Sequence, residues 1–109
     1  MKNIMENEKW KNIVKRTTEY VINSFDQIVY AVDFGAYIAP EDYFVSYIFK
    51  NDTALQNAES TGLSDEINRL HKLKMLENGY PKNSVKDCVF ASQEDCDRRF
   101  NGNWYYYYK

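Results

Sequence analysis

The sequence predicts a small single α+β domain over residues 1–109, in which helices pack on a mixed, mainly antiparallel sheet of about four strands. Two patterns lead to this prediction. Residues 10–25 carry apolar side chains at helical spacing, whereas residues 27–34 alternate apolar and polar side chains, as a half-buried strand does. Turn-forming residues separate the later runs, which gives the element order α-β-β-α-α-β-α-β.

The first helix and the hairpin after it form the part that the rest of the chain is expected to cover. The helix has an apolar stripe formed by Trp10, Ile13, Val14, Thr17, Tyr20, Val21 and Phe25. Strands are predicted at Gln27–Phe34 and Phe44–Phe49, and the second has bulky apolar residues on both faces, as a central strand does. The segment between them is rich in turn formers, so the two strands are predicted to pair through a long loop.

Capping signals predict two helices after this hairpin. Asn51 or Asp52 can cap a short helix through Glu59, which Gly62 ends. Ser64 is then expected to cap a longer helix, which stops at Asn78-Gly79. The buried stripe of this longer helix is predicted to hold Ile67 and Leu70, extended by Leu73 or Leu76.

The last part of the chain is predicted to be a strand, a helix and a strand. Val85–Ala91 alternates in the manner of a strand, and Ser92 begins a segment that resembles a capping box. The helix that follows is expected to close at Asn101-Gly102. Trp104–Tyr108 consists of five consecutive aromatic residues, which favours a final strand within the sheet.

Charge is distributed unevenly along the chain. The net charge is −2, but residues 21–66 hold eight acidic residues and one basic residue, which gives 1 − 8 = −7. The first 20 residues contribute +2 and residues 67–109 contribute +3. An acidic middle segment argues against direct nucleic-acid binding there and suits a basic partner, although a solvated acidic surface that keeps the protein soluble has the same composition.

The sequence also predicts a compartment. The N-terminal segment has no apolar core of a signal peptide, and no apolar run reaches the length of a membrane helix, so we expect a cytoplasmic protein without a membrane contact. Cys88 and Cys96 are then expected to be reduced thiols. One histidine and no CxxC motif predict no metal site, and no motif predicts a cofactor.

No catalytic motif is present in the sequence. His71, the only histidine, is expected at the edge of a helical apolar stripe, with no neighbouring residue to orient it as a general base. Cys88 could act as a nucleophile only with a lowered thiol pKa, which the sequence does not indicate. We therefore predict no enzymatic activity and no catalytic residues, and keep an enzyme that uses His71 or Cys88 as an alternative.

The predicted partner-binding surface is the loop Tyr37–Tyr43. Tyrosines supply contact area, carboxylates accept arginine bonds, and loops on rigid scaffolds often mediate recognition. The candidate partner-binding residues are Asp33, Tyr37, Glu41, Asp42, Tyr43, Asp52, Tyr105 and Tyr107. Two alternatives remain open: Tyr37 and Tyr43 could fold back onto the core, and Tyr105–Tyr108 could line a pocket for a small molecule.

Three segments together resemble a known kind of protein. They are YFVSYIFKNDTALQNAESTGL, HKLKMLENGYP and FASQEDCDRRFNGNWYYYYK. Together with the layout of residues 27–109, they resemble the small bacterial immunity proteins of polymorphic-toxin and contact-dependent growth-inhibition systems. The resemblance implies a cytosolic protein that binds and neutralises a cognate toxin domain, often a nuclease, by covering its active site or an adjacent surface. A nuclease is usually basic, which would suit the acidic middle segment.

Three functional hypotheses follow from the sequence. The first is this immunity protein, a monomer or weak dimer with a basic toxin domain as its partner. The second is a non-enzymatic small-molecule-binding or regulatory module that uses Tyr105–Tyr108. The third is the enzyme that uses His71 or Cys88.

Overall fold

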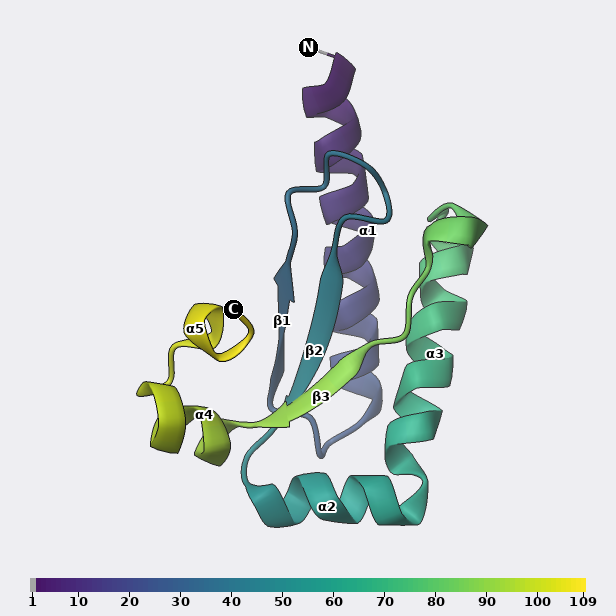
Figure 1. The fold of residues 1–109 in the computed structure, drawn as a ribbon. Coiled ribbons are helices and arrows are strands. Elements are labelled where there is room, and N and C mark those ends of the chain that lie inside the picture. Colours follow the sequence, from purple (N-terminus) through teal and green to yellow (C-terminus); the bar gives the residue numbers. More distant parts are fainter. Residues whose placement is uncertain (1) are drawn as a thin grey trace.

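The computed structural model describes residues 2–109, with side chains from residue 8 onward. Five α-helices, three strands and one short 3-10 helix make up this part of the chain (Figure 1). In chain order they are α1 (Lys2–Ser24), β1 (Tyr30–Phe34), β2 (Phe44–Phe49), α2 (Asp52–Thr61), α3 (Leu63–Glu77), η1 (Lys82–Ser84), β3 (Val89–Ser92), α4 (Gln93–Phe100) and α5 (Trp104–Tyr107). The predicted α+β class is therefore confirmed.

The sheet has three described strands in the order β1-β2-β3. β1 pairs with β2 in the antiparallel direction, from Tyr30 opposite Ile48 to Phe34 opposite Phe44. β3 pairs with the other edge of β2 in the parallel direction, because α2 and α3 return the chain to the starting end of the sheet. The predicted sheet of about four mainly antiparallel strands is thus corrected to a mixed sheet with one antiparallel and one parallel pair.

The missing strand is the aromatic segment at the C-terminus, which forms α5 instead. The side chain of Asn103 accepts a hydrogen bond from the backbone N–H of Tyr106 and so caps a new helix. Trp104, Tyr107 and Tyr108 face the protein at helical spacing, whereas Tyr105 and Tyr106 are exposed. The local cap and the i, i+3, i+4 burial pattern therefore override the strand propensity of the aromatic residues.

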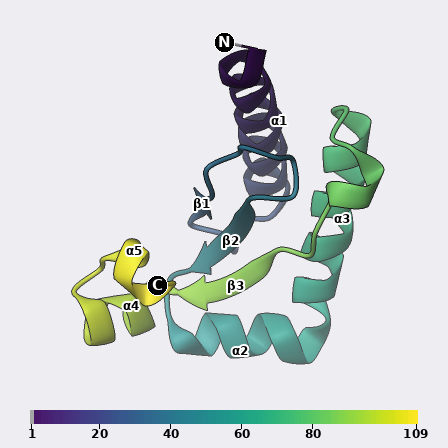
Figure 2. The same ribbon diagram turned by 45° about the horizontal axis from the view of Figure 1, so that its top comes forward.

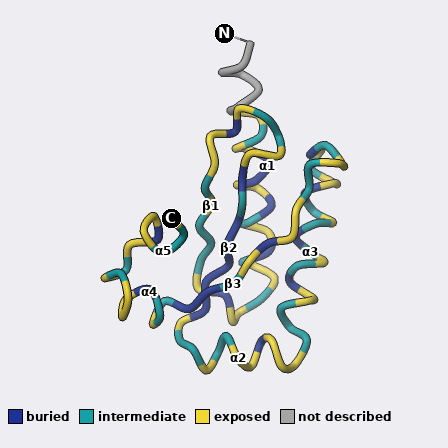
Figure 3. The backbone as a smooth tube through the Cα atoms, in the orientation of Figure 1, coloured by how far each residue is buried: buried dark blue, intermediate teal, exposed yellow. Residues whose placement is uncertain are grey.

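Helices cover both faces of the sheet, as Figures 1 and 2 show. Side chains at odd positions of β2, such as Tyr47 and Phe49, belong to the main core with α1, α2 and α3. Ile48, on the opposite face of β2, packs in a second core with Ala91, Cys96 and Trp104. Because β2 is buried on both faces, it is the central element of the fold (Figure 3).

The predicted helix boundaries hold where a capping side chain sets them. Asn51 accepts a hydrogen bond from Ala54 N at the start of α2, and Ser92 accepts one from Asp95 N at the start of α4. α3 begins at Leu63, one residue before the expected cap at Ser64. β1 and β3 are shorter than the predicted runs, at Tyr30–Phe34 and Val89–Ser92.

The inward stripe of α3 differs from the predicted one. Ile67, His71 and Met75 are buried, whereas Leu73 and Leu76 are exposed. His71 is therefore a core residue and not the boundary residue that the sequence indicated. Its neighbours in the sequence are Leu70 and Lys72. The side of the helix that faces inward is set by packing against α1 and β2, which the local pattern does not contain.

Replacing Gly35 by alanine is expected to lower the free energy of unfolding by about 2–3 kcal/mol. Gly35 has φ +135°, and a Cβ added there would lie 2.2 Å from Asp42 O and 2.6 Å from Tyr43 Cα, both in the backbone. Urea unfolding followed by circular dichroism would measure the loss. The matched control is Gly62→Ala, with φ +85° and no atom within 4 Å of the added Cβ, where a loss of about 1 kcal/mol is expected. Equal losses in both variants would contradict the steric argument.

Candidate partner-binding loop

The connection between β1 and β2, residues 35–43, is termed the β1–β2 loop. It lies beside α1 in Figure 1, and its backbone closes on itself through two hydrogen bonds. Tyr37 N donates to Asp42 O over 3.2 Å, and Asp42 N donates to Ala39 O over 3.0 Å. Tyr37 takes a positive φ of 54°, which tightens the turn after Gly35. The loop therefore has a defined conformation of its own.

Buried aromatic rings fix this loop to the rest of the protein. The ring of Tyr37 stacks on that of Tyr43, with 6.2 Å between ring centroids. Tyr43 packs edge-to-face against Tyr80, with 5.2 Å between their centroids. Tyr80 in turn meets Trp10 of α1 at 5.3 Å. All three tyrosines are at most 3% exposed. The row of rings joins the loop to α1 and to the turn after α3, so the loop is anchored by core packing.

The tyrosine hydroxyls are also hydrogen-bonded. Tyr37 donates to Asp33 Oδ2 over 2.9 Å, and Tyr80 donates to the carbonyl of Pro40. Tyr43 accepts a bond from Lys86 N over 3.0 Å. Burial raises the pKa of Tyr43, so its hydroxyl stays protonated at neutral pH.

Tyr37 and Tyr43 are consequently part of the core and not an exposed contact surface. The sequence left this alternative open beside the prediction of an exposed tyrosine pair, and burial decides between them. The sequence signal was ambiguous because tyrosine suits a half-buried core and a binding surface equally well.

The outer side of the loop carries an apolar residue among carboxylates. Ile38 is 72% exposed, the highest value among the exposed large apolar side chains of the described residues, and Glu41 and Asp42 are exposed on the same loop. Asp33 is exposed at the end of β1, just before the loop. Sequence reasoning missed Ile38, although an isoleucine among turn formers was a visible signal.

Two cations lie close to the rings of the same region. Lys11 Nζ is 5.9 Å from the centroid of the Tyr37 ring, and Lys86 Nζ is 5.4 Å from that of Tyr43. Lys86 Nζ also donates to the carbonyl of Tyr43 over 3.0 Å. These lysines are held against tyrosine rings and backbone, so they offset only part of the negative charge of Asp33, Glu41 and Asp42.

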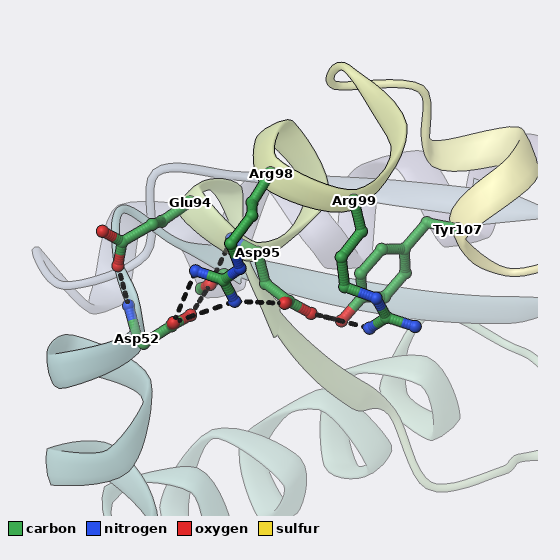
Figure 4. A network of polar contacts seen from close by, with 7 residues as sticks. Asp52, Glu94, Asp95, Arg98, Arg99 and Tyr107 are labelled. Atoms are coloured by element: carbon green, nitrogen blue, oxygen red, sulfur yellow. Dashed lines mark hydrogen bonds and ion pairs between the residues drawn. The ribbon is translucent and has the colours of Figure 1, made fainter.

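Asp52 lies at the opposite end of β2 and has a structural role (Figure 4). Both terminal nitrogens of Arg98 donate to Asp52 Oδ2 over 3.2 Å. The hydroxyl of Ser92 also donates to this carboxylate, and Glu94 accepts a bond from Asp52 N over 3.0 Å. These contacts join α2 to α4, so Asp52 is neutralised by Arg98 and lies apart from the β1–β2 loop.

Tyr107 belongs to the same polar network. Its hydroxyl donates to Asp95 Oδ2 over 2.7 Å, and Arg99 contacts the same oxygen at 3.0 Å (Figure 4). The bond from Tyr107 and the two neighbouring arginines lower the pKa of Asp95 below its ordinary value. Tyr105 is 59% exposed on the outer side of α5, so it is the more exposed of the two predicted tyrosines.

The predicted small-molecule pocket at Tyr105–Tyr108 is not supported by the packing of these rings. The rings of Tyr107 and Tyr108 contact each other, with 5.0 Å between their centroids, and both pack against Trp104 and the sheet. A shallow groove of about 290 Å³ lies elsewhere, between the end of α1 and α3. It is lined by Phe25, Glu66, Arg69, Leu70 and Leu73.

The two residues of the enzyme hypothesis are both buried. His71 Nδ1 lies 2.8 Å from Tyr47 Oη, and burial lowers the pKa of His71 to about 4. Burial also raises the pKa of the Cys88 thiol to about 12, so little thiolate forms near neutral pH. Among residues with described side chains, no three His, Cys, Asp or Glu groups are placed to hold a metal ion. His71 and Cys88 are thus both enclosed by the protein in this structure.

Comparison of the chain with protein-family models, curated proteins and solved structures gave no match. Within the described residues, no helix has both the length and the apolar character needed to cross a membrane. On the surface of the protein, the β1–β2 loop combines a fixed backbone, the exposed side chain of Ile38 and the two carboxylates of Glu41 and Asp42.

Proposed function

We propose that this chain is an immunity-type inhibitor, which binds a basic toxin domain through the outer side of the β1–β2 loop. The observation that carries this proposal is the exposed Ile38 on the same loop as the exposed Glu41 and Asp42, with buried tyrosines that hold the loop in place. The resemblance of the three sequence segments to bacterial immunity proteins agrees with a partner of this kind.

A fixed loop is physically suited to tight binding. Because core packing already orders the β1–β2 loop, little conformational entropy is lost when a partner contacts it. An exposed isoleucine can fill an apolar pocket on the partner, and desolvated apolar anchors supply much of the binding energy in interfaces. Carboxylates around it attract a positively charged surface and can accept bidentate hydrogen bonds from arginine.

The partner expected from this chemistry is a protein domain with an apolar depression bordered by lysine or arginine. The substrate-binding face of a nuclease has such positive charge, because it must attract phosphate. An inhibitor that covers this face, or a surface beside it, would exclude the substrate. The cytoplasm is the proposed compartment, where such an inhibitor meets an incoming toxin.

A charge reversal on the loop tests the proposal. In Glu41→Lys and Asp42→Lys, association with the partner is expected to slow by about tenfold at low salt, and the difference should shrink as salt rises. The partner is first obtained by a tagged pull-down with the genomic neighbours expressed, and rates are then measured by surface plasmon resonance. The matched control is Glu59→Lys, an exposed acid on α2, which should bind as the natural chain does.

Ile38 separates the apolar part of the contact from the charged part. Ile38→Ala is expected to accelerate dissociation while leaving the association rate nearly unchanged, because apolar anchors act mainly after encounter. Unaltered binding in all three loop variants, with the fold intact, would remove this loop from the proposal. The toxin's own activity, measured with and without the chain, decides inhibition, and a complex that leaves this activity intact would contradict an immunity function.

A further inference from the structure

The tip of the β1–β2 loop, residues 38–41, receives few hydrogen bonds. The turn bond from Asp42 N to Ala39 O stays within the loop. In the part of the chain that the structure describes, one hydrogen bond reaches the tip from another element. The hydroxyl of Tyr80, in the turn after α3, donates it to the carbonyl of Pro40. The orientation of the tip relative to the rest of the protein therefore depends on this bond.

Pro40 is the residue through which the tip can be oriented most directly. It lies two residues after Ile38 and one residue before Glu41, which are both exposed on the proposed contact surface. Proline has a fixed φ and no N–H, so its carbonyl is the only backbone hydrogen-bonding group that it offers. A bond to this carbonyl fixes the plane of the peptide that joins Pro40 to Glu41. The direction in which Glu41 leaves the loop is thereby fixed as well.

Tyr80 is held firmly enough to impose this orientation. It is 3% exposed, and its ring packs edge-to-face against Trp10 and Tyr43, with 5.3 and 5.2 Å between the ring centroids. Its backbone N–H donates to Met75 O over 2.9 Å. A ring that is packed on two sides and fixed at its backbone has little freedom to lose, so its hydroxyl is a rigid anchor for the loop.

The turn that carries Tyr80 is in turn bonded to α1. Asn78 Nδ2 donates to the hydroxyl of the buried Thr17 over 3.1 Å, and Arg16 donates to Asn78 O over 3.5 Å. Figures 1 and 2 show the β1–β2 loop and the end of α3 at the same end of the molecule. A continuous set of contacts therefore runs from α1 through the turn after α3 to Pro40.

We propose that Tyr80 is the positioning residue of the partner-binding loop, and that its hydroxyl holds Ile38 and Glu41 in the orientation that a partner binds. This inference rests on the proposed function, because it assigns a role within the same contact surface. Tyr80 is buried and acts through Pro40 instead of touching the partner. Without the hydroxyl the tip samples several orientations. Only a fraction of the molecules is then competent to bind, which weakens the apparent affinity by that fraction.

The order of the loop tip in the free protein is the first test, because it needs no partner. Tyr80→Phe removes the hydroxyl and keeps the packed ring. NMR relaxation should give the backbone amides of Ile38 and Glu41 an order parameter of about 0.85 in the natural chain, as in a rigid backbone, and below about 0.6 in the variant. Equal order of the tip in the two proteins would overturn the proposal.

A matched control and a rescue separate this bond from a general loss of packing. Tyr107→Phe removes a bonded tyrosine hydroxyl that donates to Asp95, in the network around α4, and should leave the tip as ordered as in the natural chain. An amino group in place of the hydroxyl, introduced as p-aminophenylalanine at position 80, supplies an N–H donor and should restore the order of the tip. Failure of this rescue, or equal loosening in Tyr107→Phe, would contradict the assigned bond.

Binding to the partner captured by the pull-down is the second test. Tyr80→Phe is expected to weaken binding by about fivefold, and titration calorimetry should show a less favourable binding entropy. A hydroxyl with a purely structural role would lower stability without changing this entropy. If Ile38→Ala weakens binding and Tyr80→Phe does not, the positioning role is overturned while the proposed function stands. If neither variant alters binding, the loop surface and this role are both refuted.

Discussion

Replacing Trp104 by alanine is expected to lower the free energy of unfolding by about 3–5 kcal/mol, the usual range for a buried tryptophan. Trp104 is 9% exposed and forms the centre of the second core. Its ring lies 5.0 Å from Tyr107 and 6.0 Å from Tyr108, measured between centroids. Its Nε1–H donates to Tyr30 Oη over 2.6 Å, which joins α5 directly to β1.

The variant removes several kinds of contact at once. The cavity that it leaves lies between α5 and the sheet, and Tyr30 loses a hydrogen-bond donor. α4 and α5 cover this face of the sheet. Their packing against β1 and β3 should therefore be destabilised more than the packing of the main core. Hydrogen exchange should show faster opening in α4 and α5 than in α1.

Urea unfolding followed by circular dichroism measures the change without relying on tryptophan fluorescence. Tyr105→Ala is the matched control, since Tyr105 is the next residue in α5 and is 59% exposed. Its expected loss is at most about 0.5 kcal/mol. A similar effect in both variants would contradict the packing of α5 on the sheet through Trp104.

Acidification from pH 6.5 to pH 4 is expected to remove about 3 kcal/mol of stability through His71, because burial lowers its pKa from 6.5 to about 4. The side chain is fully buried, and within the described residues its Nε2 has no hydrogen-bond partner. Burial lowers its pKa from 6.5 to about 4, against a smaller opposing effect of the Asp87 charge. The folded state therefore disfavours the charged imidazolium.

Acid destabilises the folded state because His71 binds a proton less readily there than in the unfolded chain. In the unfolded chain His71 takes up a proton near pH 6.5, whereas the folded state resists protonation until about pH 4. The contribution of neutral His71 to stability is thus fully present above pH 6.5, and it is lost as the pH decreases from 6.5 to about 4. Asp87 and Asp95 have pKa values lowered from 3.8, so their contributions are lost mainly at lower pH.

His71→Gln isolates this contribution, because glutamine can still bond the Tyr47 hydroxyl but does not titrate. Urea unfolding at half-unit steps from pH 7 to pH 4 should give a steep loss for the natural chain and a much shallower one for the variant. The same slope in both proteins would show that other groups cause the acid sensitivity.

The elements that the sequence predicted well are those with a local cause. Asn51 and Ser92 cap their helices with their own side chains, and Asn78-Gly79 ends α3 as expected. β2 has the predicted bounds, because bulky residues on both of its faces identify a central strand wherever it lies. The α+β class follows from such local patterns.

The elements that the sequence predicted poorly depend on contacts between distant residues. Trp104–Tyr108 has strand propensity, but the packing of Trp104 against Tyr30 selects a helix. β3 pairs in the parallel direction only because two helices intervene between it and β2. The cap at Asn103 is local, but neither of these long-range contacts is present in a short window of the sequence.

Some features of the candidate site were likewise predictable from local sequence, whereas others depend on contacts between distant residues. Sequence alone indicated an acidic loop between two strands, and Glu41 and Asp42 are exposed on it. Only the tertiary structure buried Tyr37, exposed Ile38 and paired Asp52 with Arg98, because burial and ion pairing depend on what the fold brings nearby. Local chemistry determined where helices and turns begin, and long-range packing decided which side chains remain available to a partner.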